Sequence, residues 1–319
     1  MDLIKPKALG KGSTVGITMP TTFLPDSDLT KGIAVLEKMG FKTKVHPGHT
    51  LRDHCRAGTD EQRGQAVNDM FADPEIDGII CAAGGSAAMR TEAFLDYEII
   101  RKNPKVFCGF SDITLLLHSI QQKAGLITFH GPVLSYLLNE DTLTLAHFAE
   151  VVAGNKVSID FPQPQLMQKG TAKGRLVGGN MALLSTLMGT PDAPDFDNAL
   201  LFIEDVGEAH FRLDRLLWHM NRAGKLENIA GVVIGEMAGA EQTVVRATGA
   251  SYGITIWDSV MELFGDRKIP IVGNAPIGHG KTTLTLPIGV KATLRVANKN
   301  ASLTLEEGAT ILNQQKEAV

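Results

Sequence analysis

The sequence predicts an α/β protein with an N-terminal, Rossmann-like parallel-sheet domain and a β-rich C-terminal domain. In the first half, short apolar runs alternate with amphipathic stretches, which is typical of successive βαβ units. The expected strands are apolar almost throughout, as in a sheet covered by helices on both faces. The 319 residues exceed the roughly 100–200 residues of an average domain, so two domains are expected.

The N-terminal domain is expected over residues 1–154. Thr59 is placed to cap a helix, and Gln62 stands at the matching capping-box position. The expected strands are Ser13–Met19, Lys42–Val45, Ile76–Ala83, Lys105–Phe110 and Leu126–His130, and the expected helices are Leu29–Met39, Thr59–Phe71 and Asp112–Gln122.

Residues 155–173 are interpreted as a linker, because they hold Pro162, Pro164 and three glutamines with little periodicity. The C-terminal domain is expected over residues 174–312. Its expected elements are strands at Ala199–Ile203, Ala230–Gly235 and Thr282–Leu286, a hairpin of Lys291–Val296 with Ser302–Leu305, and an amphipathic helix at His210–Ala223.

Composition argues against several classes of protein. The formal net charge of −4 lacks the basic excess of a nucleic-acid-binding protein, and no apolar run reaches the roughly 18 residues of a membrane helix. No secretory signal is recognised. The cysteines Cys55, Cys81 and Cys108 form no C-x-x-C motif, so neither a disulfide framework nor structural zinc is expected, and a cytoplasmic location is favoured. Without H-E-x-x-H, P-loop or G-x-G-x-x-G motifs, no metal or cofactor is expected.

The segment Cys108–Ile113 could carry chemistry. A strand ends, Gly109 allows close backbone approach, and Ser111 stands where a helix begins. This order is typical of a nucleophile elbow, whose following N–H can serve an oxyanion hole. The alternative is that Ser111 or Asp112 merely caps the helix, and these residues alone favour the cap.

Three further segments lie at expected strand ends or in glycine-rich turns. Gly84-Gly85 could expose N–H groups to an anion or form an ordinary tight turn. Glu204-Asp205 ends an apolar strand and would normally be solvated or cap the next helix. His279 is flanked by Gly278 and Gly280, which leaves its ring accessible or places it in a surface loop. His118, within an apolar helix, is expected to be packed there.

Together Ser111, Glu204 and His279 offer a nucleophile, an orienting carboxylate and a general base. A serine hydroxyl is a poor nucleophile at neutral pH unless a base takes its proton. The histidine in turn needs a partner that fixes its tautomer and stabilises its charged form.

These segments, in this order, resemble the LD-carboxypeptidase family of serine peptidases, which includes muramoyltetrapeptide carboxypeptidases and microcin-immunity peptidases. The co-occurrence is specific, although no single segment is decisive. The matching segments are Asp73-Pro74, Ile76–Cys81, Gly84-Gly85, Pro104-Lys105, Gly109–Thr114, His130–Pro132, Leu176–Asn180, Gly189–Pro191, Phe202–Asp205, Asp214-Arg215, Gly235-Glu236 and Gly278–Gly280.

The resemblance implies that Ser111 is the nucleophile, that Glu204 orients the base and that the base is His279. It further implies an oxyanion hole made by the backbone N–H groups of Gly85 and Asp112. The family's triad assembles across the interface of a parallel α/β domain and a β-rich domain, without metal or cofactor. Homodimers are usual in the family, so a homodimer is expected.

The chain departs from the family's R-G-G-Y-G motif after the third strand. Ala83 stands in place of the arginine, and Ser86-Ala87 stand in place of the tyrosine and the glycine. Arginine is the natural partner of a substrate carboxylate. Either Arg90 takes over this role from the next helical turn, or the substrate differs. Gly84, Ser86 and Arg90 are the candidate substrate contacts.

The resemblance therefore implies a serine carboxypeptidase that acts through an acyl-enzyme. It would cleave the L,D amide bond before the terminal D-alanine of a murein tetrapeptide, in cell-wall recycling. One alternative substrate is a peptidyl- or aminoacyl-nucleotide conjugate resembling microcin C. An alternative of another class is a non-catalytic peptide-binding protein on the same scaffold, favoured only by the altered Ala83–Ala87 loop.

Overall fold

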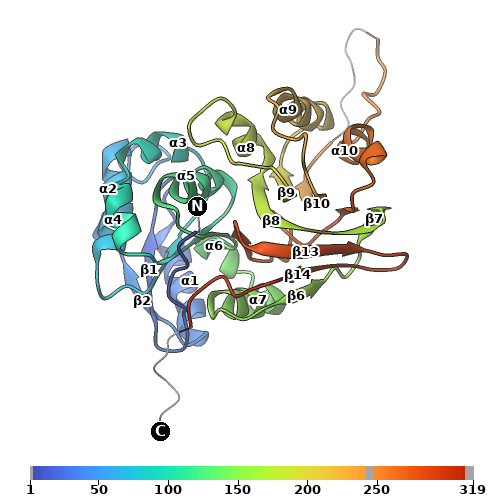
Figure 1. Ribbon diagram of the computed structural model, residues 1–319. Coiled ribbons are helices and arrows are strands. Elements are labelled where there is room, and N and C mark those ends of the chain that lie inside the picture. The colour runs from blue at the N-terminus through green and yellow to red at the C-terminus, as the bar shows by residue number, and fades with distance from the viewer. Residues whose placement is uncertain (1–2, 242–247, 313–319) are drawn as a thin grey trace. The chain divides into compact units, whose positions relative to one another are not determined.

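The computed structural model describes residues 3–241 and 248–312, which divide into two compact units (Figure 1). Unit 1 comprises Met1–Val157, Leu284–Gly289 and Glu307–Val319, and unit 2 comprises Ser158–Thr283 and Val290–Glu306. None of the helices in these ranges is both long and apolar enough to cross a membrane.

Unit 1 is built on a six-stranded sheet in the order β12-β5-β4-β3-β1-β2. β1 to β5 run parallel, as expected of βαβ units, and only β12 is antiparallel to its neighbour. The strands are β1 (Thr14–Thr18), β2 (Lys42–Val45), β3 (Gly78–Cys81), β4 (Val106–Gly109), β5 (Thr128–His130) and β12 (Leu286–Ile288).

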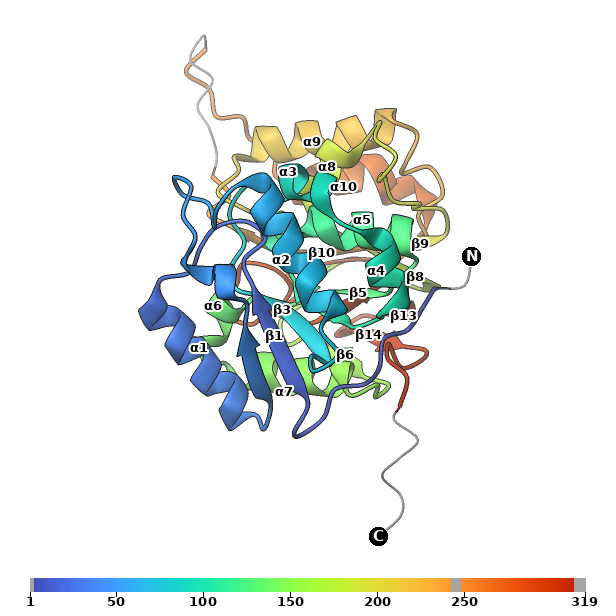
Figure 2. The same ribbon diagram turned by 90° about the vertical axis from the view of Figure 1, so that its left-hand side faces the viewer.

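Helices cover both faces of this sheet, with α2, α4 and α5 on one face and α1, α6 and α7 on the other (Figures 1 and 2). The predicted capping box is confirmed, since Thr59 Oγ1 accepts from Gln62 N–H and Gln62 Oε1 from Thr59 N–H. The helices are α1 (Asp26–Lys38), α2 (Asp60–Ala72), α3 (Ala88–Thr91), α4 (Tyr97–Lys102), α5 (Thr114–Ala124), α6 (Leu134–Leu137) and α7 (Thr142–Val152).

Unit 2 is built on an eight-stranded mixed sheet in the order β6-β14-β13-β8-β9-β10-β11-β7. β8 to β11 are parallel, and the predicted hairpin is confirmed as the antiparallel pair β13–β14. The strands are β6 (Ser158–Asp160), β7 (Gln165–Gln168), β8 (Gly170–Asn180), β9 (Ala199–Val206), β10 (Gly231–Ala238), β11 (Ile271–Gly273), β13 (Lys291–Val296) and β14 (Ala301–Leu305).

Three helices of unit 2 pack against the parallel part of its sheet. They are α8 (Met181–Leu187), α9 (His210–Arg222) and α10 (Ile256–Phe264). Leu184 of α8, Leu217 of α9 and Val260 of α10 meet the inner face of β8–β11 in one apolar core. This core supports the end of β9, where Glu204 stands.

The linker expected at residues 155–173 is wrong, because this segment contains β6, β7 and the start of β8. β6 and β7 are the two edge strands of the sheet, and most of their side chains are exposed or half-buried, which conceals a strand period. The two prolines stand between these strands, where no ladder hydrogen bond is required of them.

The chain also returns to unit 1 after the expected start of the C-terminal domain. The strand expected at Thr282–Leu286 lies at Leu286–Ile288 and completes the sheet of unit 1, beside β5. Residues 307–312 belong to unit 1 as well. A division at one linker therefore does not describe the two units.

Candidate active site

Ser111 stands one residue beyond the end of β4, after Phe110, and lies half-buried in a short 3₁₀ turn, Ser111–Ile113, that leads into α5. Its φ angle of +64° is uncommon for a residue with a side chain. Neither the 3₁₀ turn nor α5 has a side-chain N-cap hydrogen bond. The helix-cap interpretation that the residues alone favoured is therefore wrong, and the backbone has the strained strand-to-helix turn of a nucleophile elbow.

The loop after β3 lies directly beside this serine. A Cβ built on Gly84 would lie 2.9 Å from Ser111 Cβ and 3.0 Å from Ser111 Oγ. Gly85 has a φ of +123°, and a Cβ there would overlap Thr22 Oγ1. Thr21 Oγ1 donates hydrogen bonds to the carbonyls of Ala83 and Gly84, at 3.1 and 2.7 Å. Both glycines are thus required by close packing, and Gly85 also by its backbone angle.

Asp112 points its carboxylate at this same loop. The side chain is 6% exposed, and Oδ2 accepts the N–H of Ala88, the first residue of α3, at 2.9 Å. Burial raises the pKa of Asp112 to about 6, although the Ala88 N–H and the nearby Arg63 guanidinium both favour the ionised form.

In unit 2, the buried Glu204 pairs with the half-buried His279. Glu204, near the end of β9, is 0% exposed, and its Oε2 lies 2.6 Å from His279 Nδ1. An ionised carboxylate can only accept, so this contact selects the tautomer in which Nδ1 carries the proton. Gly278 has a φ of +96°, and a Cβ there would overlap the Glu204 carboxylate. The glycine before the histidine therefore lets the carboxylate reach the ring.

Asp205, the second acid of this strand end, has a different role. Its carboxylate accepts the N–H groups of Ala182 and Val206, at 2.9 and 2.8 Å, and the Asn180 amide at 3.2 Å. Burial raises its pKa to about 6, helped by the neighbouring Glu204. Both acids are buried, so the expected solvation is wrong, and Asp205 binds the first turn of α8, not of the helix that follows it.

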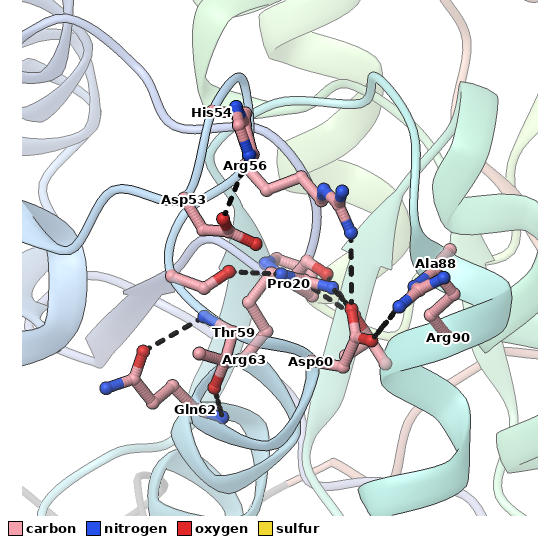
Figure 3. Close-up of polar contacts among 12 residues, drawn as sticks. Pro20, Asp53, His54, Arg56, Thr59, Asp60, Gln62, Arg63, Ala88 and Arg90 are labelled. Atoms are coloured by element: carbon pink, nitrogen blue, oxygen red, sulfur yellow. Dashed lines mark hydrogen bonds and ion pairs between the residues drawn. The ribbon is translucent and has the colours of Figure 1, made fainter.

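Of the candidate substrate contacts, Ser86 is exposed and Gly84 half-buried, next to Ser111. Arg90 is 64% exposed, but its Nε and Nη2 lie 2.9 and 2.7 Å from Asp60 Oδ2 (Figure 3). Arg63, fully buried, also pairs with Asp60, and the two guanidinium groups lower the pKa of Asp60 to about 2.

Sequence reasoning missed the Thr21–Thr22 segment and the Asp60–Arg63 pair. The first could have been found, because Pro20-Thr21-Thr22 follows β1 at the same carboxyl edge of the sheet as the loops after β3 and β4. His118, predicted to be packed, is 0% exposed. Across residues 3–241 and 248–312, no cluster of three or more His, Cys, Asp or Glu side chains is arranged to hold a metal ion.

Comparison with known proteins places the chain among the serine peptidases. The model of the LD-carboxypeptidase N-terminal domain matches residues 15–131, and that of the LD-carboxypeptidase C-terminal domain matches residues 173–294. The chain belongs to the LD-carboxypeptidase family, which confirms the resemblance drawn from its motifs and the expected fold class.

Similar proteins span nearly the whole chain. A probable murein peptide carboxypeptidase of Bacillus subtilis is 34% identical over 312 residues, 96% of each chain. The solved muramoyltetrapeptide carboxypeptidase of Oxalobacter formigenes superposes with a TM-score of 0.83 at 27% identity, over 92% of this chain and 98% of that one. The MccF-like protein of Bacillus anthracis gives 0.85 at 26% identity, over 95% and 99%.

Proposed function

We propose that this peptidase removes the terminal D-alanine of a murein tetrapeptide by cleaving the L,D amide bond before it. The observation that carries the proposal is the contact between the buried Glu204 and the half-buried His279, which holds a histidine in the tautomer of a general base. The strained Ser111 beside Gly84-Gly85 supports it. Among its relatives, those of Bacillus subtilis and Oxalobacter formigenes are named for murein peptides.

The reaction begins when Ser111 Oγ attacks the carbonyl carbon of the scissile amide. His279 Nε2 accepts the serine proton, and Glu204 stabilises the resulting imidazolium. The N–H groups of Gly85 and Asp112 stabilise the oxyanion of the tetrahedral intermediate. His279 then protonates the leaving amine, D-alanine departs, and the shortened peptide remains as an ester on Ser111. Water, deprotonated by His279, hydrolyses this ester and restores the free serine.

The same loop would contact the substrate through Gly84, Ser86 and Arg90. Ser86 offers an exposed hydroxyl in place of the family's tyrosine. Because Arg90 already pairs with Asp60, a substrate carboxylate would have to share this guanidinium. Ala83 does not supply the guanidinium that the family's arginine has at this position, so we assign Arg90 the outer, anionic part of the substrate.

A second candidate substrate is a peptidyl- or aminoacyl-nucleotide conjugate. It is favoured by the likeness to the MccF-like protein of Bacillus anthracis and by the altered Ala83–Ala87 loop. The chemistry at Ser111 would be the same, with a different acyl group on the serine and a different leaving group. A purely binding protein is disfavoured, because binding requires neither the strained serine nor a buried carboxylate–histidine pair.

The test is hydrolysis of a purified murein tetrapeptide, followed by mass spectrometry, with Ser111→Ala and His279→Ala alongside. We expect the wild type to release D-alanine, and neither variant to release it. The wild type should release little L-alanine from the diastereomer that ends in L-alanine. Hydrolysis of an aminoacyl-nucleotide conjugate without D-alanine release would establish the second candidate. A folded wild type that binds tetrapeptide and cleaves neither substrate would establish the binding protein.

We further propose that the enzyme is a cytoplasmic homodimer. The described cysteines, Cys55, Cys81 and Cys108, are all free thiols, as in proteins of reducing compartments. Sedimentation equilibrium should give twice the 34.2 kDa chain mass. A single species at the chain mass over the micromolar range would contradict the dimer.

A further inference from the structure

We propose that Asp112 is a positioning residue whose carboxylate clamps the Gly84–Ala88 loop beside Ser111. The clamp would keep Gly85 where its N–H serves the oxyanion. The inference rests on the proposed function, since it assigns a task to a side chain of the same site. It is distinct from the role of the Asp112 backbone N–H, because here the carboxylate acts through another residue.

The contact that carries the inference is buried and local. Asp112 Oδ2 accepts the N–H of Ala88 at 2.9 Å, and Ala88 is 0% exposed. Ala87 precedes this N–H and has no side chain that could cap α3. The carboxylate next in sequence to Ser111 therefore supplies the acceptor that the loop itself lacks.

The loop needs such a clamp because its backbone is strained. Ala87 has a φ of +99°, in a region where an L side chain strains the backbone. The family's motif has glycine here, which adopts this angle without that strain. The alanine of this chain thus holds a glycine-like conformation that other contacts must stabilise.

Contacts on the far side of Ala87 provide the rest of the support. The Ala87 carbonyl accepts the N–H groups of Arg90 and Thr91, at 3.0 and 2.9 Å. Thr91 Oγ1 donates a hydrogen bond to the Pro20 carbonyl at 2.7 Å and accepts one from Arg63 Nε at 3.0 Å. The surrounding network of Arg63, Asp60 and Arg90 is visible in Figure 3. α3 is thereby anchored to the loop after β1.

The two ends of the loop are thus held by different groups. Thr21 Oγ1 holds the carbonyl of Gly84 at one end, and Asp112 holds the N–H of Ala88 at the other. Gly85 and Ser86 lie between these points and are exposed. Releasing the Asp112 end would let Ala87 relax toward a common backbone angle, and the peptide of Gly85 would turn with it. The transition state should then be less stabilised, because the oxyanion forms there.

The test uses the full-length enzyme with Asp112→Ala, Asp112→Asn, Ala87→Gly and the double variant Asp112→Ala/Ala87→Gly. Asp96→Ala is the matched control, because Asp96 also accepts backbone N–H groups at the start of a helix of unit 1, α4. Two rates are measured, D-alanine release and phosphonylation of Ser111 by a fluorophosphonate. The second rate needs the oxyanion hole but not the peptide.

We expect Asp112→Ala to lower kcat roughly 10²-fold, as loss of an oxyanion-hole donor does, with KM little changed. Asp112→Asn keeps an acceptor oxygen and should lose less than about tenfold. Ala87→Gly in the Asp112→Ala background should restore roughly tenfold, because glycine removes the strain. Asp96→Ala should leave kcat unchanged. A folded Asp112→Ala enzyme with wild-type kcat, or no recovery in the double variant, overturns the proposal.

The two proposals fail in different ways. If wild type releases no D-alanine but phosphonylation slows in Asp112→Ala, the murein substrate is wrong and the clamp stands. Equal D-alanine release by wild type and Asp112→Ala would support the murein substrate and contradict the proposed role of the Asp112 carboxylate. Should Asp112→Ala not fold, hydrogen exchange at residues 84–88 of Asp112→Asn replaces it. Faster exchange there with unchanged kcat would contradict the clamp.

Discussion

At the scale of single residues, the geometry of Gly278 explains why the proposed base and its carboxylate meet. In the sequence, His279 stands between two glycines, which we expect to leave its ring accessible. The structure adds that the first glycine leaves room for Glu204 Oε2 against His279 Nδ1. A contact between residues 75 positions apart has no local signature, so spacing alone could not predict it.

Replacing Glu204 by glutamine tests the carboxylate without removing its volume. The amide carries no charge to stabilise an imidazolium and does not select the Nδ1–H tautomer, so kcat should fall by about 10²–10⁴-fold. The melting temperature should not fall, because no buried charge loses its partner. Steady-state kinetics and circular dichroism melting measure the two effects. Asp195→Asn, at an exposed ion pair with Arg175, is the control and should change neither. Wild-type kcat in Glu204→Gln would contradict the assignment.

Gly278→Ala tests the space beside the carboxylate. The added methyl overlaps Glu204 and strains a backbone with a φ of +96°, so kcat should fall at least about 10²-fold. Gly189→Ala is the matched control, because Gly189 has a φ of +85° with nothing within 4 Å of its added Cβ. This control should lose about 1 kcal/mol of stability and no activity. Equal kcat values for Gly278→Ala and Gly189→Ala would show that Gly278 is needed only for its backbone angle. The space beside Glu204 would then not matter for activity.

At the scale of elements, the sequence predicts well the features that depend on neighbouring residues. It does not predict the features that depend on tertiary contacts. The strand at Lys42–Val45 and the capping box at Thr59 are confirmed, because each depends on neighbouring residues. The edge strands β6 and β7 were missed, since little of either is buried. β12 was assigned to the wrong domain, because its partner β5 lies more than 150 residues earlier.

The junction of α7 with the segment before β12 should make stability depend on pH. His147 Nδ1 accepts the Thr285 N–H at 3.1 Å, and burial lowers the pKa of His147 from 6.5 to about 4. Between these values the unfolded chain binds more protons than the folded one, so stability rises with pH. The gain is about 3 kcal/mol between pH 4 and 7.

Urea unfolding of the wild type and His147→Gln at several pH values measures this contribution. Glutamine accepts the same N–H but does not titrate, so its stability relative to wild type should fall as the pH rises. The difference between the two proteins is the relevant quantity, because Asp112 and Asp205, with raised pKa values, act in the opposite direction over part of this range. Parallel pH curves for the two proteins would rule out the contribution of His147.

At the scale of the whole molecule, the chain passes between its two units four times, at residues 157/158, 283/284, 289/290 and 306/307. The fold class and the family could be predicted because both depend on motifs in a fixed order. The path of the chain between the units could not be predicted, because a segment that returns to a distant sheet has no distinctive composition. The proposed nucleophile belongs to unit 1, whereas the proposed base and its carboxylate belong to unit 2.

A fragment of residues 1–157 should not fold cooperatively. It lacks β12, so the edge of β5 is unpaired, and it loses Leu284, Leu286 and Ile288, each 0% exposed in the full chain. The fragment therefore lacks the stabilisation that burying each of these side chains provides, about 1.5–3 kcal/mol. Urea titration followed by near-ultraviolet circular dichroism compares the fragment with the full chain. A sharp transition with a native-like spectrum from the fragment would show that unit 1 does not need its returning strand.

The most direct test of the account is to find which residue attacks the scissile centre. A phosphonate aryl ester that mimics the peptide at the terminal L,D amide is reacted with the enzyme. It phosphonylates the nucleophile with loss of the phenol, and the adduct is located by peptide mapping and mass spectrometry. The account predicts one adduct, on Ser111, that forms quickly in the wild type, far more slowly in His279→Ala and not at all in Ser111→Ala. An adduct on another residue, or no adduct in a preparation that releases D-alanine, would contradict the assignment of Ser111 as the nucleophile.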